Sequence, residues 1–428
     1  MSDAGERPAE PESAAAVAAS PGRRIAVDLS PLRRHRDFRV LSIGSFVSLF
    51  GSQLTRVAIP FQVYALTKSS FAVGLLALFE LGPILGLSLW GGAVADAVDR
   101  RRVMVGTDAA LLVVSLALAA NAVAFHRPNL TAIYALAALA AALYCFGRPA
   151  LDAAIPRLVP PSDFPAAAAL NGLQYNLGGI LGPALAGVLI AAFGVGPAFV
   201  IDAATFGAAL ACGLLLSPIP PAPGARPAGL RSIGEGLRYV RRSQLLMGSY
   251  AIDLVAMVFG MPNALLPALA VEHFHGGATT LGLLAAAPAA GALAASALSG
   301  WTARIERYGL AIAAPAAAWG VAIVAFGLTD HLALALVALA AAGAADMISG
   351  IFRMVLWNTV VPDELRGRLA GVELAGYASG PALGNFEAGW VASLRGLRFS
   401  VVSGGAACVV GAVAVVACLR EFRSYKQP

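Results

Sequence analysis

The residues of this chain that could do chemistry are polar and charged side chains set within long apolar segments. The candidates for substrate binding or proton coupling are Gln53, Arg56, Glu80, Asp253, Asn263 and Asp346. A charged side chain deep in a bilayer is costly, so it marks a functional site by default. Burial favours the neutral form of a carboxylate. At least one of Glu80, Asp253 and Asp346 is therefore expected to take up a proton on one side of a membrane and release it on the other.

The surroundings of these candidates suggest how they interact. Gln53 and Arg56 are three residues apart and share a helical face. An ion pair between Arg56 and Glu80 is expected if their segments are neighbours, and it would serve either transport or packing alone. Asn263 lies in the stretch FGMPNALLP, whose glycine and prolines predict a break that is either a gating bend or a tolerated kink.

Other charges are expected near the ends of their segments. Arg353 could extend its side chain to the lipid headgroups, and Asp202 could reach water. The same holds for Asp108, Asp152, Glu373 and Glu387. These residues are therefore left out of the predicted site.

The composition identifies the surroundings of the chain as a bilayer. Of its 428 residues, 58% are hydrophobic and only 13% are charged, and the mean hydropathy is +0.75. Soluble domains carry about 25% charged residues. Twelve continuous apolar segments are each about long enough to cross a membrane as a helix, so an all-α polytopic membrane protein is predicted. They lie near residues 40–65, 71–91, 104–125, 131–151, 166–192, 196–217, 246–271, 279–301, 309–328, 332–356, 369–392 and 400–419.

The segments divide into two groups of six with a proline-rich and then basic stretch between them. The predicted organisation is a disordered cytoplasmic tail at 1–37, a six-helix bundle at 38–217, a cytoplasmic linker at 218–243, a second bundle at 244–420 and a cytoplasmic tail at 421–428.

An internal repeat supports this division. Val159-Pro160 and Val361-Pro362 each precede an acidic loop and then a helix with the sequence Gly-Pro-Ala-Leu. Repeated halves of this kind place a binding site at their interface, with one half rocking against the other.

Lys and Arg set the expected orientation. With the N-terminus inside, most of these residues fall in cytoplasmic connections. The net charge of +6 is therefore a topology signal, and no nucleic-acid partner is expected.

Other classes of function lack the residues they need. The four cysteines and five histidines form no cluster suited to a metal or to catalysis, and no phosphate-binding loop of the G-x-x-x-x-G-K-S/T type occurs. No metal, cofactor or enzymatic activity is expected. A membrane enzyme or a non-transporting sensor is the distant alternative.

The connection GGAVADAVDRRR, residues 91–102, concentrates charge between the second and third segments. Twelve spans, a six-plus-six repeat and this loop resemble the major facilitator superfamily. The resemblance implies a cytoplasmic gate in which Asp96 faces the N-terminal end of the eleventh span and Asp99 contacts arginines at 366–368. The predicted gate residues are Gly91, Gly92, Asp96, Asp99, Arg100 and Arg101.

Within that superfamily the chain resembles the branch of bacterial siderophore exporters and macrolide efflux proteins, through the stretches RVAIPFQVYALTKSS, LVPPSDFPAAAALNG and VVPDELRGRLAG. The fifth span is similar to the signature of the antiporters, with Gly178, Gly182, Pro183 and Gly187. Ordinary packing of small residues is an equal explanation of these four.

The resemblance and the residues together predict a secondary transporter. We expect it to export an amphiphilic small molecule, siderophore-like or drug-like, by alternating access and proton antiport, with the proton gradient as its only energy source. The alternative is an importer of a small nutrient. The expected setting is the bacterial cytoplasmic membrane, with both termini inside, a small-molecule substrate, protons and lipid as partners, and a monomeric state.

Overall fold

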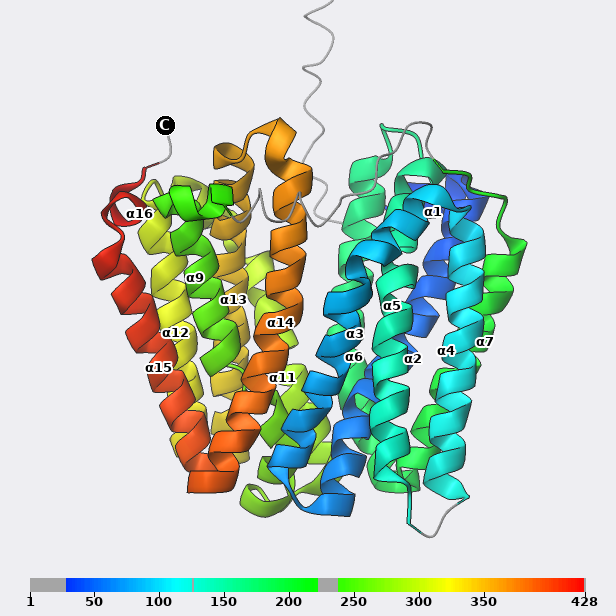
Figure 1. The fold of residues 1–428 in the computed structure, drawn as a ribbon, viewed down its shortest axis with the longest axis horizontal. Helices are drawn as coiled ribbons and strands as arrows, with labels where there is room; N and C mark the ends of the chain where they lie inside the picture. Colours follow the sequence, from blue (N-terminus) through cyan, green and yellow to red (C-terminus); the bar gives the residue numbers. More distant parts are fainter. Residues whose placement is uncertain (1–27, 125–126, 222–237, 427–428) are drawn as a thin grey trace, which may run out of the picture.

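The computed structural model describes residues 28–124, 127–221 and 238–426, without the side chains of residues 89, 303, 363–368, 370–375, 377 and 378. The described part of the chain is almost wholly helical (Figure 1). The first half contains α1 (Ser30–Arg34), α2 (Arg36–Thr67), α3 (Ser70–Ala97), α4 (Arg100–Val123), α5 (Leu130–Leu158), α6 (Phe164–Phe193) and α7 (Val195–Leu215). The second half contains α9 (Gln244–Phe259), η1 (Asn263–Leu265), α10 (Leu266–Ala268), η2 (Leu269–His273), α11 (Gly277–Ala297), η3 (Ser299–Arg304), α12 (Tyr308–Leu328), α13 (Leu332–Val360), α14 (Asp363–Arg395), α15 (Leu397–Cys418) and α16 (Arg420–Ser424).

The long helices correspond to the twelve predicted segments, which confirms the all-α prediction. In the described residues, ten helices are long and apolar enough to cross a membrane, counting α9 through η2 as one. The other two, α2 and α14, have 32 and 33 residues. Both carry more charge, but about 20 residues suffice to span a bilayer.

The structure describes residues 28–37 of the tail predicted over residues 1–37, and most of these residues are helical. Helix α1 occupies Ser30–Arg34, with Pro31 in its first turn, and α2 begins at Arg36. Proline is favoured in the first turn, where its missing N–H has no partner to lose. The prediction of disorder was therefore wrong for residues 30–37. Residues 1–27 lie outside the described residues.

The two halves repeat one packing scheme. In the first half α2 packs on α6 and α7, α3 on α5, and α4 on α5 and α7. In the second half α9 packs on α14 and α15, α11 on α13, and α12 on α13 and α15. Each helix of one half thus has a counterpart with the same neighbours in the other.

The halves meet through α3 with α14 and through α6 with α11. The tightest approaches join glycine to backbone: a Cβ on Gly389 would lie 3.3 Å from Cα of Gly74, and one on Gly187 would lie 2.9 Å from Cα of Gly282. All four glycines lie in the part of their helix farthest from the end that holds α1 and α16. We call this region of contact the closed end and the opposite one the terminal end.

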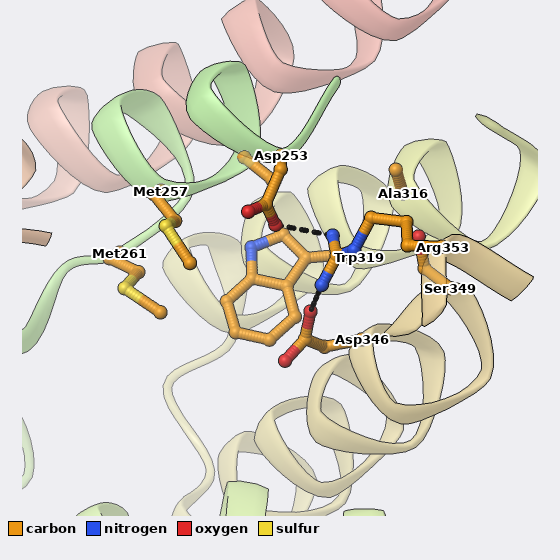
Figure 2. A pocket seen from close by; sticks show the side chains of 9 residues that line it. Asp253, Met257, Met261, Ala316, Trp319, Asp346, Ser349 and Arg353 are labelled. Carbon is orange, nitrogen blue, oxygen red and sulfur yellow. Dashed lines mark hydrogen bonds and ion pairs between the residues drawn. The ribbon is translucent and has the colours of Figure 1, made fainter. Parts of the chain in front are cut away.

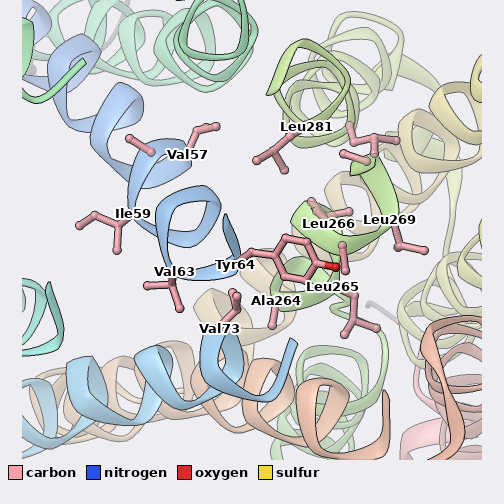
Figure 3. Close-up of a cluster of buried hydrophobic side chains, with 14 of the residues drawn as sticks. Val57, Ile59, Val63, Tyr64, Val73, Ala264, Leu265, Leu266, Leu269 and Leu281 are labelled. Carbon is pink, nitrogen blue, oxygen red and sulfur yellow. The ribbon is translucent and has the colours of Figure 1, made fainter. Parts of the chain in front are cut away.

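The closed end has a continuous apolar core drawn from both halves. Val57, Val63 and Tyr64 of α2 belong to the same buried cluster as Leu265 and Leu269 of the seventh span (Figure 3). Toward the terminal end the ribbons of the two halves diverge (Figure 1). A Cβ on Gly86 of α3 would have no atom within 4 Å. The two halves are therefore in contact at the closed end and diverge toward the terminal end, which holds α1 and α16.

Candidate functional site

The second half holds a cluster of three charged side chains. The Arg353 guanidinium on α13 forms an ion pair through Nη1 with Oδ1 of Asp253 on α9, and its Nη2 lies 3.4 Å from Oδ1 of Asp346 (Figure 2). The side chains of Arg353 and Asp253 are 12% and 15% exposed, whereas that of Asp346 is 48% exposed. One cation is thus shared by a buried and an accessible carboxylate.

The charged cluster borders a pocket with apolar walls. Its remaining lining residues are Ala256, Met257, Met261, Ala316, Trp319 and Ser349. The Trp319 indole lies beside the charged side chains (Figure 2), and its Nε1 donates a hydrogen bond of 2.9 Å to the Gly260 carbonyl. Soft thioethers and an aromatic ring around hydrogen-bonding charges suit an amphiphilic ligand.

Arg353 is the residue of this cluster that sequence reasoning missed. Its predicted place at the lipid headgroups was wrong, because two carboxylates bind its guanidinium inside the bundle. A signal was present in the sequence: Arg353 and Asp346 are seven residues apart, so they lie two turns apart on one helical face.

The seventh span is broken where the sequence predicted. Helix α9 ends at Phe259, and the chain resumes as a 3-10 turn at Asn263. The Asn263 side chain is exposed, while the next residue, Ala264, donates its N–H to Oδ1 of Asn385 on α14 at 3.0 Å. A hydrogen bond therefore connects the break to α14, and Asn263 does not belong to the charged cluster.

The candidates of the first half do not converge in the same way. Gln53 is buried against Gly182 of α6. Arg56 is exposed and acts electrostatically on Glu80, but these two described side chains make no ion pair. The expected Arg56–Glu80 ion pair is therefore not formed in this structure, although α2 and α3 are in contact.

Asp202 is a second residue that the sequence misplaced. It is 2% exposed, and its Oδ2 accepts hydrogen bonds from Thr55 on α2 at 2.7 Å and from Ser115 on α4 at 2.8 Å. The prediction that Asp202 could reach water was wrong, because α7 packs against both α2 and α4. The spacing along one segment carries no information about these neighbours.

The charged loop is built into the first half. Asp99 caps α4, accepting from the Arg102 N–H at 3.2 Å. Arg100 is buried and donates to the Pro220 carbonyl at 2.9 Å, and Arg101 donates to the Gly213 and Leu214 carbonyls at the C-terminal end of α7. A cation is favoured there by the helix dipole.

Other gate residues occupy two different settings. Gly91 lies against the backbone of Cys145 on α5, so a side chain there would overlap its carbonyl, whereas Gly92 faces open space. Asp96 is partly exposed. The expected partners of Asp96 and Asp99 at the start of α14 include side chains outside the described residues, so those contacts stay predictions.

The glycines of the antiporter-like stretch are packing positions on α6. Gly178 adjoins Leu49 and Gly182 adjoins Gln53, both on α2, while Gly187 and the Pro183 carbonyl adjoin Gly282 on α11. The stretch thus connects α2 of its own half to the other half. Among the described residues, no group of three His, Cys, Asp or Glu could hold a metal ion.

Solved structures of transporters share this fold. A POT family transporter in complex with 5-aminolevulinic acid superposes with a TM-score of 0.74 at 12% identity, covering 91% of this chain and 97% of that one. A bacterial homolog to the human lysosomal transporter Spinster, in an inward-facing and unoccupied conformation, gives 0.70 at 16% identity, covering 94% and 99%.

Curated relatives match along nearly the whole chain. The enterobactin exporter EntS of Citrobacter koseri is 30% identical over 403 residues, which cover 94% of this chain and 96% of the relative. The protein of the same name from Escherichia coli O1:K1 / APEC is 29% identical over 401 residues, with the same coverage. Residues 26–427 match the family described as transmembrane secretion effector. The chain therefore belongs to this family of major facilitator transporters, in the branch of the enterobactin exporters, and is a multi-pass membrane transporter rather than an enzyme.

Proposed function

We propose that the protein exports an amphiphilic small molecule, siderophore-like or drug-like, by proton antiport across the bacterial cytoplasmic membrane. The observation that carries the proposal is the Asp253–Arg353–Asp346 cluster beside the pocket of Met257 and Trp319. The names of the relatives support export as the direction.

The cluster has the charge balance that exchange requires. With both carboxylates ionised, two negative charges face one guanidinium, so the cluster carries one excess negative charge. A proton or a hydrogen-bonding cargo group at the accessible Asp346 would relieve it, while Arg353 compensates the buried Asp253. Competition of proton and cargo for Asp346 would couple their opposite movements.

The positive charge of the terminal end supports a cytoplasmic location for it. Arg34, Arg36, Arg102 and Arg304 are exposed there, and basic connections stay on the cytoplasmic side. In this orientation the two halves diverge toward the inside and both termini are cytoplasmic. Closing would bring the loop with Asp96 toward the start of α14, where it would act as the inner gate of a monomer.

The test is transport into inverted membrane vesicles from a panel of siderophores and lipophilic cations, with and without an imposed proton gradient. We expect gradient-dependent accumulation of at least one compound and loss of that dependence in Asp346→Asn. Asp330→Asn, which changes an exposed carboxylate in the α12–α13 loop, is the matched control. Unchanged coupling in Asp346→Asn would overturn the assignment of the cluster, and no transport of any compound would overturn the class of cargo.

A further inference from the structure

The buried carboxyl group of Asp202 is not used by the proposed exchange at Asp346. It lies in the first half, between α7, α2 and α4. Both hydroxyl donors, Thr55 and Ser115, bond to one oxygen, Oδ2. The other oxygen, Oδ1, has no hydrogen-bond partner among the described residues and lies over Gly51, where a Cβ would be 2.8 Å away.

Among the described residues, no cation forms an ion pair with the Asp202 carboxyl group, whose side-chain partners are two neutral hydroxyl groups. The charged and titratable side chains grouped with Asp202 around Tyr144 of α5 are Arg56 on α2 and Asp108 on α4, so this part of the first half holds Arg56, Asp108 and Tyr144 besides Asp202. Arg56 is the cation among these three, and its side chain is exposed. Burying an ionised carboxylate without a counter-charge is strongly unfavourable.

The hydrogen bonds fit the neutral acid better than the ion. An ionised carboxylate has two equivalent oxygens that both need donors, whereas a carboxylic acid has one carbonyl oxygen and one hydroxyl. Oδ2, with its two donors, has the pattern of the carbonyl oxygen. Oδ1, which has no donor, is the oxygen on which a proton would remove the unbalanced charge.

We propose that Asp202 is a proton-binding site of the first half and that it carries a proton in this conformation. A row of hydroxyl groups, Thr55 and Ser52 on α2 and Tyr144 on α5, leads away from it. Thr55 is partly exposed, and Ser52, one turn earlier on the same face of α2, accepts a hydrogen bond of 2.6 Å from Tyr144. Tyr144 is 43% exposed, and this row of hydroxyl groups is the route by which the proposed proton would exchange with water. The site does not depend on the cargo or on the direction of transport.

Infrared difference spectroscopy of the full chain in lipid nanodiscs at neutral pH tests the proposal. A neutral carboxylic acid shows a C=O stretching band that an ionised carboxylate lacks. We expect this band in the wild type, its loss in Asp202→Asn, and its retention in Asp108→Asn as the matched control. Transfer to D2O is expected to shift the band, because the proposed proton exchanges with water.

Two further variants keep the test independent of the folding of Asp202→Asn. Thr55→Val and Ser115→Ala each remove one donor to Oδ2, and weaker hydrogen bonding moves a C=O band to higher frequency. We expect an upward shift in both, without loss of the band. A wild-type spectrum with only carboxylate bands, or a neutral-acid band that none of these variants changes, would overturn the site. A band that resists D2O would overturn its exchange with water.

Discussion

The Tyr64 hydroxyl on α2 donates a hydrogen bond to the Glu272 carboxylate in η2, and this bond joins the two halves of the transporter at the closed end. Lys68, at the C-terminal end of α2, lies 5.7 Å from the centre of the Tyr64 ring. Tyr64 itself is 2% exposed, within the apolar cluster shared by both halves (Figure 3). In the proposed alternating-access cycle, this bond would have to break when this end opens.

We expect Tyr64→Phe to favour opening of the closed end. A hydrogen bond to a charged group contributes about 1.5–3 kcal/mol, so the ratio of open to closed molecules should rise by about tenfold or more. Distances between spin labels at positions 68 and 331, in a variant without its four cysteines, measure this ratio. Tyr134→Phe removes a hydroxyl bonded to Ala72 within one half and should leave it unchanged. An equal response of both variants would contradict a specific role of Tyr64.

We expect Gly187→Val to open the same end through overlap instead of a lost bond. Its side chain would meet the backbone of Ala278 and Gly282 on α11, and overpacking of this kind costs about 1–3 kcal/mol. The labels at 68 and 331 report the result. Gly172→Val, on the same helix at a place with no atom within 4 Å, is the control. A closed end that tolerates valine at 187 would show that this contact is not tight.

We expect Arg353→Ala to destabilise the protein more than the double variant Arg353→Ala/Asp253→Asn. Removing one partner of a buried ion pair costs about 3–5 kcal/mol because the other charge stays unpaired, and Asp253→Asn removes that charge. Thermal unfolding in detergent compares the two. Equal melting temperatures would mean that Asp253 does not depend on Arg353 for its compensation.

Variants of Asp99 can distinguish its capping of α4 from a role in the cytoplasmic gate. Asp99→Ala should lower the free energy of unfolding by about 1 kcal/mol, because α4 loses its N-cap, whereas Asp99→Ser keeps a cap. If Asp99 also contacts arginines of the gate, Asp99→Ser should still favour the open terminal end, measured by spin labels at positions 102 and 304. A distance unchanged in Asp99→Ser would leave Asp99 with the capping role alone.

We expect Asp96→Asn to shift the protein toward the conformation open at the terminal end and to slow export. The expected interaction of Asp96 with the start of α14 favours an anion, through the helix dipole, and the amide removes that charge. The labels at 102 and 304 measure the shift. Asp96→Glu, which keeps the charge, should retain more of the closed population. Unchanged distances in Asp96→Asn would remove Asp96 from the gate.

Features that depend on the order of residues along one helix could be predicted from the sequence. Features that depend on the packing of a neighbouring helix could not. The helices follow from apolar runs of membrane length, and the break before Asn263 follows from its glycine and prolines. Asp253 and Asp346 stand out because they are charged within such runs. Arg353 and Asp202 were misplaced because their exposure is set by α9, α2 and α4, whose packing no spacing within α13 or α7 reveals.

The glycine contacts at the closed end also bear on how fast the halves can separate. Gly74 with Gly389 and Gly187 with Gly282 bring backbone against backbone, so parting them releases few interlocked side chains. Repacking side chains carries a cost in rotamer entropy, and these contacts largely avoid it. The barrier to parting at these glycines should therefore be low, so the resistance of the closed end to separation should come from its apolar core and from the Tyr64–Glu272 hydrogen bond.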